Sequence, residues 1–293
     1  MPRAIITRKS AAGKEYWVEI LPIILYDKQE KNPNKRRGNR PMRIFASSPR
    51  ALKQAFGFFG QTGRIVSLVG GGGKTTLMYF MAKTCAGEGK KVLVTTTTHI
   101  FAPAARYYAA DADQARVLWA QGSFAVIGTP VPEKGKLKAP DARLLDPLME
   151  EADVVFIEAD GSKHCPIKVP REGEPVFHDR SDLVIAVMGL SAIGKPLYEC
   201  CFGLAGATEL LDTAADHILT AADAAKILSS ELGSRKDLGN REFCVVLNQC
   251  DDGKRRRTAN EIAMWLREFG VDQVVMTAFD PEERVQYDAI SKG

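Results

Sequence analysis

Residues 66–76 restrict the possible folds of this chain more than any other segment. They read V-S-L-V-G-G-G-G-K-T-T, with four glycines between a run of β-forming residues and the start of a helical pattern. Glycine backbone turns tightly and lets several N–H groups converge on one anion, because no Cβ stands in the way. The N-terminus of the following helix favours an anion at the same place. A strand, a glycine loop and a Lys-Thr pair in this order predict a phosphate-binding loop, or P-loop.

The loop also predicts individual contacts to a nucleotide. Lys74 would reach the β- and γ-phosphates and take part in catalysis, and the Thr75 hydroxyl would bind Mg²⁺. The match to the pattern G-x-x-x-x-G-K-[S/T] is incomplete, because Leu68 occupies the first glycine position, but residues 70–76 are intact. This shorter core resembles the loops of the deviant P-loop ATPases and GTPases and of the Mur ligases. The predicted nucleotide-binding residues of the loop are Gly70, Gly71, Gly72, Gly73, Lys74, Thr75 and Thr76.

Strand-like and helical patterns alternate through most of the chain. Strands are predicted at residues 64–69, 91–95, 124–127, 154–157, 183–188, 243–247 and 274–277, and helices at 74–86 and near 141–151. Capping boxes predict two more helix starts, at Thr220 with Asp223 and at Thr258 with Glu261. Such alternation is typical of βαβ units around a mostly parallel sheet. We therefore expect an α/β, P-loop NTPase-like three-layer fold for residues 43–293.

The first 42 residues differ from the rest in charge. Residues 1–40 contain ten Lys or Arg and four Asp or Glu, whereas the remainder contains 30 against 32. Residues 28–40 are polar and basic without apolar periodicity, which predicts a disordered arm at residues 1–42. The alternatives for this arm are a solvated linker, an extension upstream of a true start at Met42, and a nucleic-acid-binding tail. The last is the least favoured, so nucleic acid is not an expected partner.

No apolar run approaches the roughly 20 residues that a membrane helix needs, so no membrane partner is expected. Residues 17–26 contain Glu19 and Pro22 and lack a small-residue cleavage site, which argues against a signal peptide. The six cysteines include no C-x-x-C pair, and the four histidines show no metal-ligand spacing. Adjacent Cys200 and Cys201 are a candidate redox or metal pair, but ordinary buried thiols in a reducing cytoplasm are the preferred interpretation. We expect a cytoplasmic protein.

Two carboxylates follow the strand predicted at residues 154–157. In an open α/β sheet, ligands bind beyond the carboxyl ends of the strands. Glu158 and Asp160 are two residues apart, so both side chains point the same way in an extended chain. An apolar strand that ends in a carboxylate is the Walker B arrangement, which holds Mg²⁺ beside the P-loop threonine. We therefore predict that Glu158 and Asp160 bind the metal and act in catalysis, with a solvated acidic turn as the alternative.

The segment N-Q-C-D follows the strand predicted at residues 243–247. It resembles the N-K-x-D motif with which P-loop GTPases recognise guanine. Asn248 and Asp251 fit that motif, whereas Gln249 replaces its lysine. These two residues are therefore predicted to contact the base, and the choice between ATP and GTP stays open.

Further polar residues at strand ends are candidates for a substrate site. Four consecutive threonines precede His99 after the strand predicted at residues 91–95. Their hydroxyls would reach Mg²⁺ or a phosphate, although threonine also simply favours strands. Two basic loops, residues 163–176 and 189–197, would face an anionic group, with surface cations as the alternative. The predicted substrate contacts are Thr97, Thr98, His99, Lys163, Lys168 and Lys195.

These motifs together resemble the YqeC-like family, the selenium-dependent hydroxylase accessory proteins. The shared segments are V-G-G-G-G-K-T-T, T-T-T-T-H-I-F, I-E-A-D-G-S-K-H-C-P-I-K-V-P, E-P-V, G-L-S-A-I-G-K-P-L and V-L-N-Q-C-D, in this order and spacing. The resemblance covers roughly residues 43–280, and it supports residues 70–76, 97–99, 158–163 and 248–251 as site segments. Family members more usually show N-K-A-D at the last segment. The resemblance implies a P-loop NTPase-like protein tied to the maturation of selenium-dependent molybdenum hydroxylases.

The sequence thus predicts a protein that binds Mg²⁺ and ATP or GTP and acts as an accessory in preparing such a hydroxylase. The hydroxylase or its cofactor-maturation proteins would be the partners, and nucleotide hydrolysis would drive insertion or docking. Two alternatives remain open. One is a Mur-ligase-like or kinase-like enzyme that acts on a small anionic substrate. The other is a nucleotide sensor that does not hydrolyse its ligand.

Overall fold

The computed structural model describes residues 5–9, 15–19, 43–46 and 48–279 of the chain. It divides into two units, residues 1–40 and 41–293. In the first unit, β1 (Ile5–Lys9) and β2 (Glu15–Glu19) pair as an antiparallel hairpin that the sequence analysis did not predict. The basic stretch at residues 28–40, on which the prediction of a disordered arm depends, lies outside the described residues.

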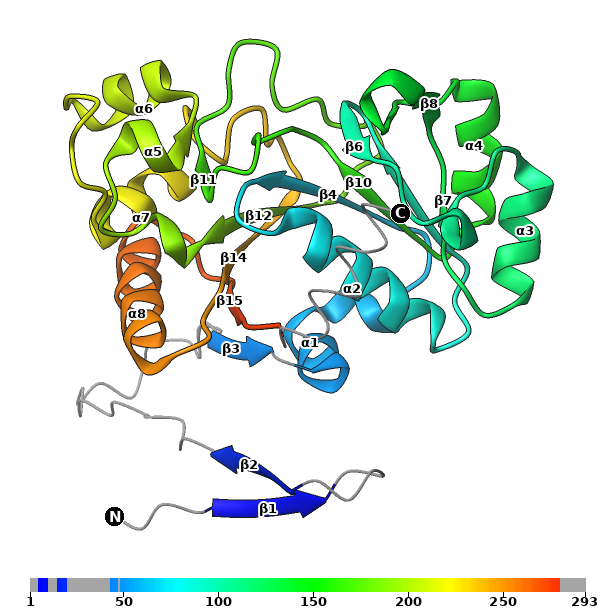
Figure 1. Cartoon of the computed structure of the whole chain (residues 1–293), viewed down its shortest axis with the longest axis horizontal. Coiled ribbons are helices and arrows are strands. Elements are labelled where there is room, and N and C mark those ends of the chain that lie inside the picture. Colours follow the sequence, from blue (N-terminus) through cyan, green and yellow to red (C-terminus); the bar gives the residue numbers. More distant parts are fainter. Residues whose placement is uncertain (1–4, 10–14, 20–42, 47, 280–293) are drawn as a thin grey trace, which may run out of the picture. The chain divides into compact units, whose positions relative to one another are not determined.

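The second unit contains an eight-stranded sheet with the order β3-β15-β14-β12-β4-β10-β5-β7 (Figure 1). All seven neighbouring pairs are parallel. Its strands are β3 (Arg43–Ala46), β4 (Arg64–Gly70), β5 (Val92–Thr96), β7 (Ala125–Val126), β10 (Val154–Glu158), β12 (Leu183–Gly189), β14 (Glu242–Asn248) and β15 (Val274–Thr277). The central strands are mostly apolar, as strands buried on both faces of a parallel sheet are. The predicted α/β fold with a mostly parallel sheet is therefore confirmed.

At β4, the side of the sheet to which successive strands are added reverses. The chain runs from β4 to β5 and β7 on one side, returns to β10, and then builds β12, β14 and β15 on the other side. Such a switch point opens a crevice at the carboxyl ends of the central strands. The loop after β4 lies in this position.

Helices cover both faces of the sheet, which confirms the three layers. Alternate residues of β12 belong to two separate cores: Leu183, Ile185 and Val187 pack in the core that contains α1 and α2, and Val184, Ala186 and Met188 in the core that contains α7 and α8. A third core packs α3 and α4 against the far end of the sheet. The helices are α1 (Pro49–Ala55), α2 (Lys74–Ala86), α3 (Ala112–Ala120), α4 (Ala142–Glu151), α5 (Leu197–Cys200), α6 (Leu204–Leu211), α7 (Ala221–Ser229) and α8 (Gly253–Glu268).

One of the two predicted capping boxes is confirmed and the other is wrong. Thr220 and Asp223 bond reciprocally at the start of α7. The Thr258 and Glu261 pair lies inside α8, because Asp252 already accepts a hydrogen bond from the backbone N–H of Arg255 and begins the helix earlier. The Thr258 hydroxyl instead donates to a backbone carbonyl of the preceding turn.

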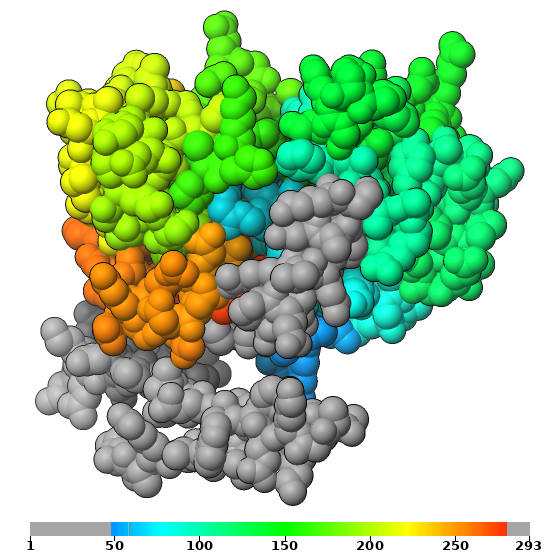
Figure 2. All heavy atoms as spheres, viewed as in Figure 1, coloured from blue at the N-terminus to red at the C-terminus, as the bar shows by residue number. Residues whose placement is uncertain are grey.

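Two small sheets that were not predicted extend the carboxyl side of the large sheet. β6 (His99–Phe101), β9 (Lys136–Lys138) and β8 (Thr129–Val131) form a three-stranded antiparallel sheet directly after β5. β11 (Ile167–Lys168) pairs in parallel with β13 (Cys201–Phe202) shortly after β10. Figures 1 and 2 place the green chain that follows β10 at the top of the domain, between the yellow helices and the cyan-to-green side that holds α3 and α4. No helix in the described part of the chain has the length and apolar character needed to cross a membrane.

Candidate functional site

The glycine loop joins the end of β4 to the start of α2, as the sequence predicts for a P-loop. Its backbone is packed against neighbouring loops: Gly71 donates to the carbonyl of Val187, and Gly72 to the carbonyl of Cys165. A Cβ at position 71 would lie 2.2 Å from that Cys165 oxygen. Gly73 adopts φ 115° and leaves the start of α2 without a side-chain cap. The free N–H groups of such a helix start favour an anion.

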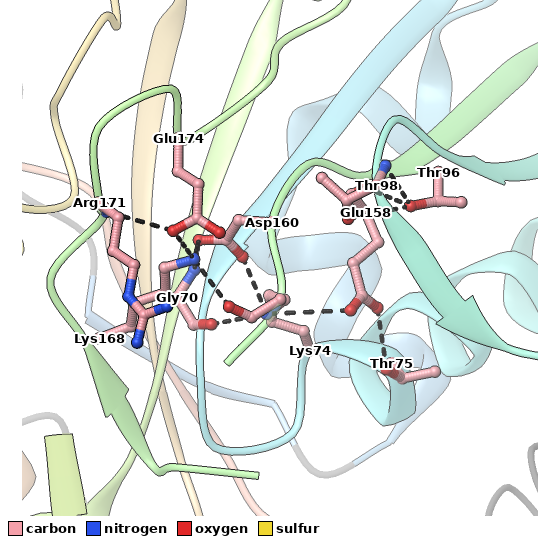
Figure 3. A network of polar contacts seen from close by, with 11 residues as sticks. Gly70, Lys74, Thr75, Thr96, Thr98, Glu158, Asp160, Lys168, Arg171 and Glu174 are labelled. Carbon is pink, nitrogen blue, oxygen red and sulfur yellow. Dashed lines mark hydrogen bonds and ion pairs between the residues drawn. The ribbon is translucent and has the colours of Figure 1, made fainter. Parts of the chain in front are cut away.

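Lys74, the first residue of α2, points back into the loop and is buried (Figure 3). Its Nζ atom donates to the carbonyl of Gly70 at 2.6 Å and lies 2.9 Å from Oδ1 of Asp160 and 3.9 Å from Oε1 of Glu158. Burial alone would lower the pKa of this lysine, but the charges of Asp160 and Glu158 outweigh it and raise the pKa. The ammonium group therefore stays charged at neutral pH.

Thr75 and Glu158 lie together beside the loop. The Thr75 hydroxyl donates to Oε2 of Glu158 at 2.9 Å. Burial raises the pKa of Glu158, while Lys74 and the Thr75 hydrogen bond act in the opposite direction. A hydroxyl beside a carboxylate suits Mg²⁺, which takes one or two protein oxygens and fills its other positions with phosphate oxygens and water. No group of three His, Cys, Asp or Glu side chains within the described ranges is arranged to hold a metal without such outside ligands.

Asp160 lies between two lysines. Its Oδ2 accepts the N–H of Gly70 at 3.1 Å and lies 3.2 Å from Nζ of Lys168, while Oδ1 faces Lys74. Both carboxylate oxygens are thus engaged with cations or backbone. This environment differs from that of Glu158, which is the better placed of the two predicted metal ligands.

Lys168, a predicted substrate contact, is part of the same buried group. Its side chain is 1 % exposed, forms a second ion pair with Glu174 at 2.8 Å and donates to the carbonyl of Gly161 at 2.7 Å. Glu174 was not among the site residues predicted from the sequence. The connected side chains, which we call the charge network, are Lys74, Glu158, Asp160, Lys168 and Glu174.

Asn248 and Asp251, the predicted base contacts, lie in different surroundings. Asn248 is buried, donates to the carbonyl of Gly72 at 2.8 Å and accepts from the hydroxyl of Thr277 at 2.9 Å. Its side chain therefore supports the P-loop backbone directly. Asp251 lies at the surface near the start of α8 and pairs with Arg255 at 2.9 Å.

Gln249, which departs from the guanine motif, ties two loops together. It adopts φ 69°, and its Oε1 accepts the N–H of Ser191 at 2.9 Å. Ser191 lies just after β12. Gly189, the last residue of β12, donates its N–H to the carbonyl of Pro166. The loops after β10, β12 and β14 therefore hold one another around the P-loop, which a linear motif does not reveal.

The remaining predicted substrate residues do not form one cluster. The Thr97 hydroxyl donates to the carbonyl of Val176. The Thr98 N–H donates to the hydroxyl of Thr96, and that hydroxyl donates to the carbonyl of Glu158. Thr98 thus lies close to Glu158 (Figure 3). The other three residues of the set, His99, Lys163 and Lys195, are exposed.

The cysteines show no sign of a redox or metal role. All six are free, and five of them are buried. Burial raises the pKa of Cys200 to about 11 and of Cys201 to about 12, so neither thiol of the adjacent pair is activated. This agrees with the preferred sequence interpretation of ordinary buried thiols.

Fold and loop together define a parallel α/β protein with a P-loop at the switch point of its sheet. The family model of the YqeC protein matches residues 66–205, which confirms the YqeC-like resemblance over that part of the chain. The curated "Uncharacterized protein YqeC" of Escherichia coli (strain K12) is 35% identical over 140 residues, which cover 44% of this chain and 53% of the relative. The chain thus matches about half the length of that relative.

Among solved structures, the MinC:MinD cell division protein complex of Aquifex aeolicus is similar, with a TM-score of 0.40 and 14% identity. The match covers 78% of this chain and 86% of that chain. The fold assignment rests on the strand order and register described above, and not on this similarity.

Proposed function

We propose that this chain binds a Mg²⁺–nucleoside triphosphate, ATP or GTP, at its P-loop and hydrolyses it. The observation that carries the proposal is the meeting of Lys74, Thr75 and Glu158 at an uncapped helix start. An ammonium group, a hydroxyl and a carboxylate in this arrangement match the three contacts that a metal-bound triphosphate requires. The loop glycines support the same function, since a side chain at position 71 would collide with backbone.

The triphosphate would change the partners of Lys74. Its Nζ atom now binds the carbonyl of Gly70 and the carboxylate of Asp160, and a phosphate oxygen would replace the first of these contacts. Asp160 would keep its ion pair with Lys168 throughout, so no buried carboxylate would lose all its partners. Thr75 and Glu158 would hold Mg²⁺, which would offset the negative charge of the phosphates.

The base would lie toward the loop after β14. Asn248 is committed to Gly72 and Thr277, so its part would be to fix the loop that carries the phosphates. Asp251 remains the candidate for reading guanine. Its replacement by alanine should weaken GTP binding more than ATP binding, by about 1–3 kcal/mol for a donor left unpaired. Equal affinities before and after the substitution would remove Asp251 from the site.

We further propose that hydrolysis serves the maturation of a selenium-dependent molybdenum hydroxylase. This part of the proposal is supported by the YqeC-like similarity of residues 66–205 alone. The client would be the hydroxylase or a protein that prepares its cofactor. A phosphate-release assay with and without client protein tests it: release that rises only with client supports the accessory role, and release that ignores the client contradicts it.

A second candidate function is phosphoryl transfer to a small anionic substrate. It is favoured by exposed cations near the P-loop, such as Lys163 and Arg171, that have no carboxylate partner among the described residues. A phosphorylated small molecule among the products would select this function over simple hydrolysis. Tight nucleotide binding that yields neither free phosphate nor a phosphorylated small molecule would instead indicate a sensor.

The primary test is Lys74→Ala, compared with Lys226→Ala, which removes an exposed lysine on α7. Titration calorimetry with Mg²⁺ and ATP or GTP should show no detectable binding for Lys74→Ala, because the lysine proposed to contact the β- and γ-phosphates is gone. Lys226→Ala should bind as the parent does. Parent-like affinity in Lys74→Ala would show that the loop does not hold a triphosphate.

A further inference from the structure

Phe101, at the end of β6, holds two groups that can carry positive charge. Phe101 is 38 % exposed. Lys136 of β9 places Nζ 4.8 Å from the ring centre, and the ring of His164 stacks on it with centres 5.7 Å apart. β6 and β9 set this geometry directly, since Phe101 and Lys136 are register partners.

Phe202, in β13, holds a second set of cations. Its ring centre lies 4.2 Å from the guanidinium carbon of Arg171 and 5.9 Å from Nζ of Lys163. Lys168 also approaches this ring, but that lysine is paired with carboxylates inside the charge network. Lys163 and Arg171 are exposed.

The backbone conformation at residues 163 and 164 directs the side chains of Lys163 and His164 to different rings. Lys163 has φ 47° and His164 has φ 67°, so two consecutive non-glycine residues adopt the left-handed conformation. This conformation is unfavourable for residues with a Cβ and is found where the surrounding structure imposes it, often at functional sites. Its effect here is that Lys163 lies against Phe202 while His164 lies against Phe101.

These four residues, which we call the cation rim, are Lys136, Lys163, His164 and Arg171. Within residues 48–279, the side chains of Lys136, Lys163 and Arg171 form no ion pair with a carboxylate; aromatic rings hold them in place instead. A cation over an aromatic face keeps its charge and its hydrogen-bond donors available for an outside anion.

The cation rim adjoins the P-loop. Cys165, the residue after His164, accepts the N–H of Gly72. On the other side, Nζ of Lys168 lies 5.0 Å from the centre of the Phe202 ring and 3.2 Å from Asp160, which accepts the N–H of Gly70 in the loop. An anion on the rim would therefore lie beside the phosphates of a nucleotide in the loop.

We propose that the cation rim binds a second ligand, a small molecule that carries a phosphate group, next to the triphosphate. This inference rests on the proposed function, because the P-loop supplies the neighbouring nucleotide. Lys163 and Arg171 share the Phe202 ring, and His164, the residue next to Lys163, shares the Phe101 ring with Lys136. Such a pair of cations matches the double charge of a phosphomonoester better than a single carboxylate, and Arg171 offers the planar donor pair that phosphate accepts. Residues 41–293 carry 30 basic against 32 acidic residues, so they lack the positive excess that a nucleic-acid backbone would need.

The test uses pyrophosphate as the probe and calorimetry as the measurement. The parent protein is first saturated with Mg²⁺ and a β,γ-imido nucleotide, so that the P-loop is filled before pyrophosphate is added. The same titration is made on Lys74→Ala without nucleotide, where the P-loop no longer binds phosphate. Binding of one pyrophosphate is expected in both cases. A Lys74→Ala protein that still binds it keeps this proposal separate from the nucleotide proposal.

The double variant Lys136→Ser/Arg171→Ser should lower pyrophosphate affinity roughly tenfold or more, since two charge-assisted contacts are lost. The matched control is Lys226→Ser/Arg267→Ser, which likewise removes one lysine and one arginine, from exposed positions on α7 and α8 outside the rim. It should stay within about twofold of the parent, because it leaves every rim cation in place.

Three results would overturn the proposal. The first is the absence of pyrophosphate binding when the P-loop is filled. The second is an equal loss of affinity in the rim variant and the control, which would indicate general surface charge. The third is a loss of imido-nucleotide affinity as large as the loss of pyrophosphate affinity, which would assign the rim cations to the nucleotide itself.

Discussion

The charge network and the cation rim both gather cations at the carboxyl end of the sheet, but they hold them in different ways. In the network, Lys74 and Lys168 are buried and each faces at least two carboxylates. In the rim, Lys136 and Arg171 lie over aromatic rings without an ion pair to any described residue. The two regions are linked, because Lys168 approaches the same Phe202 ring as Arg171.

The difference separates structural charge from available charge. A buried ion becomes costly as soon as its partner is removed, so the loss of one member of the network should lower the free energy of unfolding. An exposed cation on an aromatic ring contributes little to stability and is free to bind an incoming anion. Substitutions of Asp160 and Lys168 should therefore affect mainly stability, and substitutions in the rim mainly binding. Lys74 and Glu158, which are also the proposed contacts to the phosphates and Mg²⁺, should affect both.

The largest effect is expected for Asp160→Ala. The substitution leaves Lys74 and Lys168 without their shared carboxylate and removes the acceptor of the Gly70 N–H. The free energy of unfolding should fall by about 3–5 kcal/mol, the usual result of breaking a buried ion pair from one side. Urea unfolding measures it. Arg171→Ala is the rim counterpart and should change the same quantity by only about 0.5–1 kcal/mol. Similar losses in the two variants would contradict the distinction.

Asn248→Ala should have the next largest effect, and it should lower both the free energy of unfolding and the affinity for nucleotide. The carbonyl of Gly72 and the hydroxyl of Thr277 would lose their partner, at a cost of about 1–3 kcal/mol. Nucleotide affinity should fall as well, because the loop loses its support. Thermal unfolding and calorimetry on the same preparations test this. The nearby surface substitution Asp251→Ala should cost only about 0–1 kcal/mol of stability, and a larger cost there would show that burial does not separate the two positions.

The two regions also differ in how far the sequence revealed them. The position of the glycine loop was predictable because strand, loop and helix are adjacent in the chain. The position of Glu158 was predictable because it ends a strand of the same parallel sheet. Lys168 was noticed only as a basic residue, since its burial between Asp160 and Glu174 depends on how a later loop folds back. The E-P-V segment that contains Glu174 was visible as a shared motif but carried no physical meaning by itself.

The cation rim was even harder to predict from the sequence. Lys136 and Phe101 are far apart in the chain and meet only because β6 and β9 pair, and neither short strand has a clear sequence pattern. The left-handed conformation of Lys163 and His164 is imposed by the surrounding loops and has no signature such as glycine. The wrong helix start at Thr258 has a similar cause, since an earlier aspartate, Asp252, outcompeted a plausible capping box.

A smaller effect is expected in the pH dependence of stability, and it connects the two regions. Burial raises the pKa of Glu158 above its ordinary value of 4.5. An acid whose pKa is raised on folding contributes stability below its unfolded pKa, and this contribution is lost as the pH rises through the folded pKa. The parent should therefore lose stability from about pH 4.5 upward relative to Glu158→Gln. Urea unfolding of both proteins at several pH values measures the difference.

The rim variant Lys136→Ser sharpens this experiment, because Lys136 lowers the pKa of Glu158. Without Lys136 the pKa of Glu158 should rise further, and the loss of stability should extend to higher pH. In the double variant with Glu158→Gln, the extension should vanish. If it persists there, the charge of Lys136 acts on some group other than Glu158, and the proposed contact between rim and P-loop is weakened.

The smallest expected effect is a gain in stability from Lys163→Gly. Glycine adopts the φ of 47° without the cost of a Cβ. The left-handed conformation costs other residues about 1–2 kcal/mol, and glycine loses about 0.5–1 kcal/mol through its more flexible unfolded chain. The net result should be a gain of about 0.5 kcal/mol in the free energy of unfolding. Pyrophosphate binding should weaken at the same time, because one rim cation is gone.

Asp237→Gly is the matched control, since Asp237 is exposed and also has a positive φ, 55°, but does not belong to the rim. It should gain comparable stability and bind pyrophosphate as the parent does. A sequence that keeps a strained lysine where glycine would be more stable is expected where the side chain serves binding. If Lys163→Gly leaves pyrophosphate affinity unchanged, Lys163 does not contribute to the rim, and its conformation has a purely structural origin.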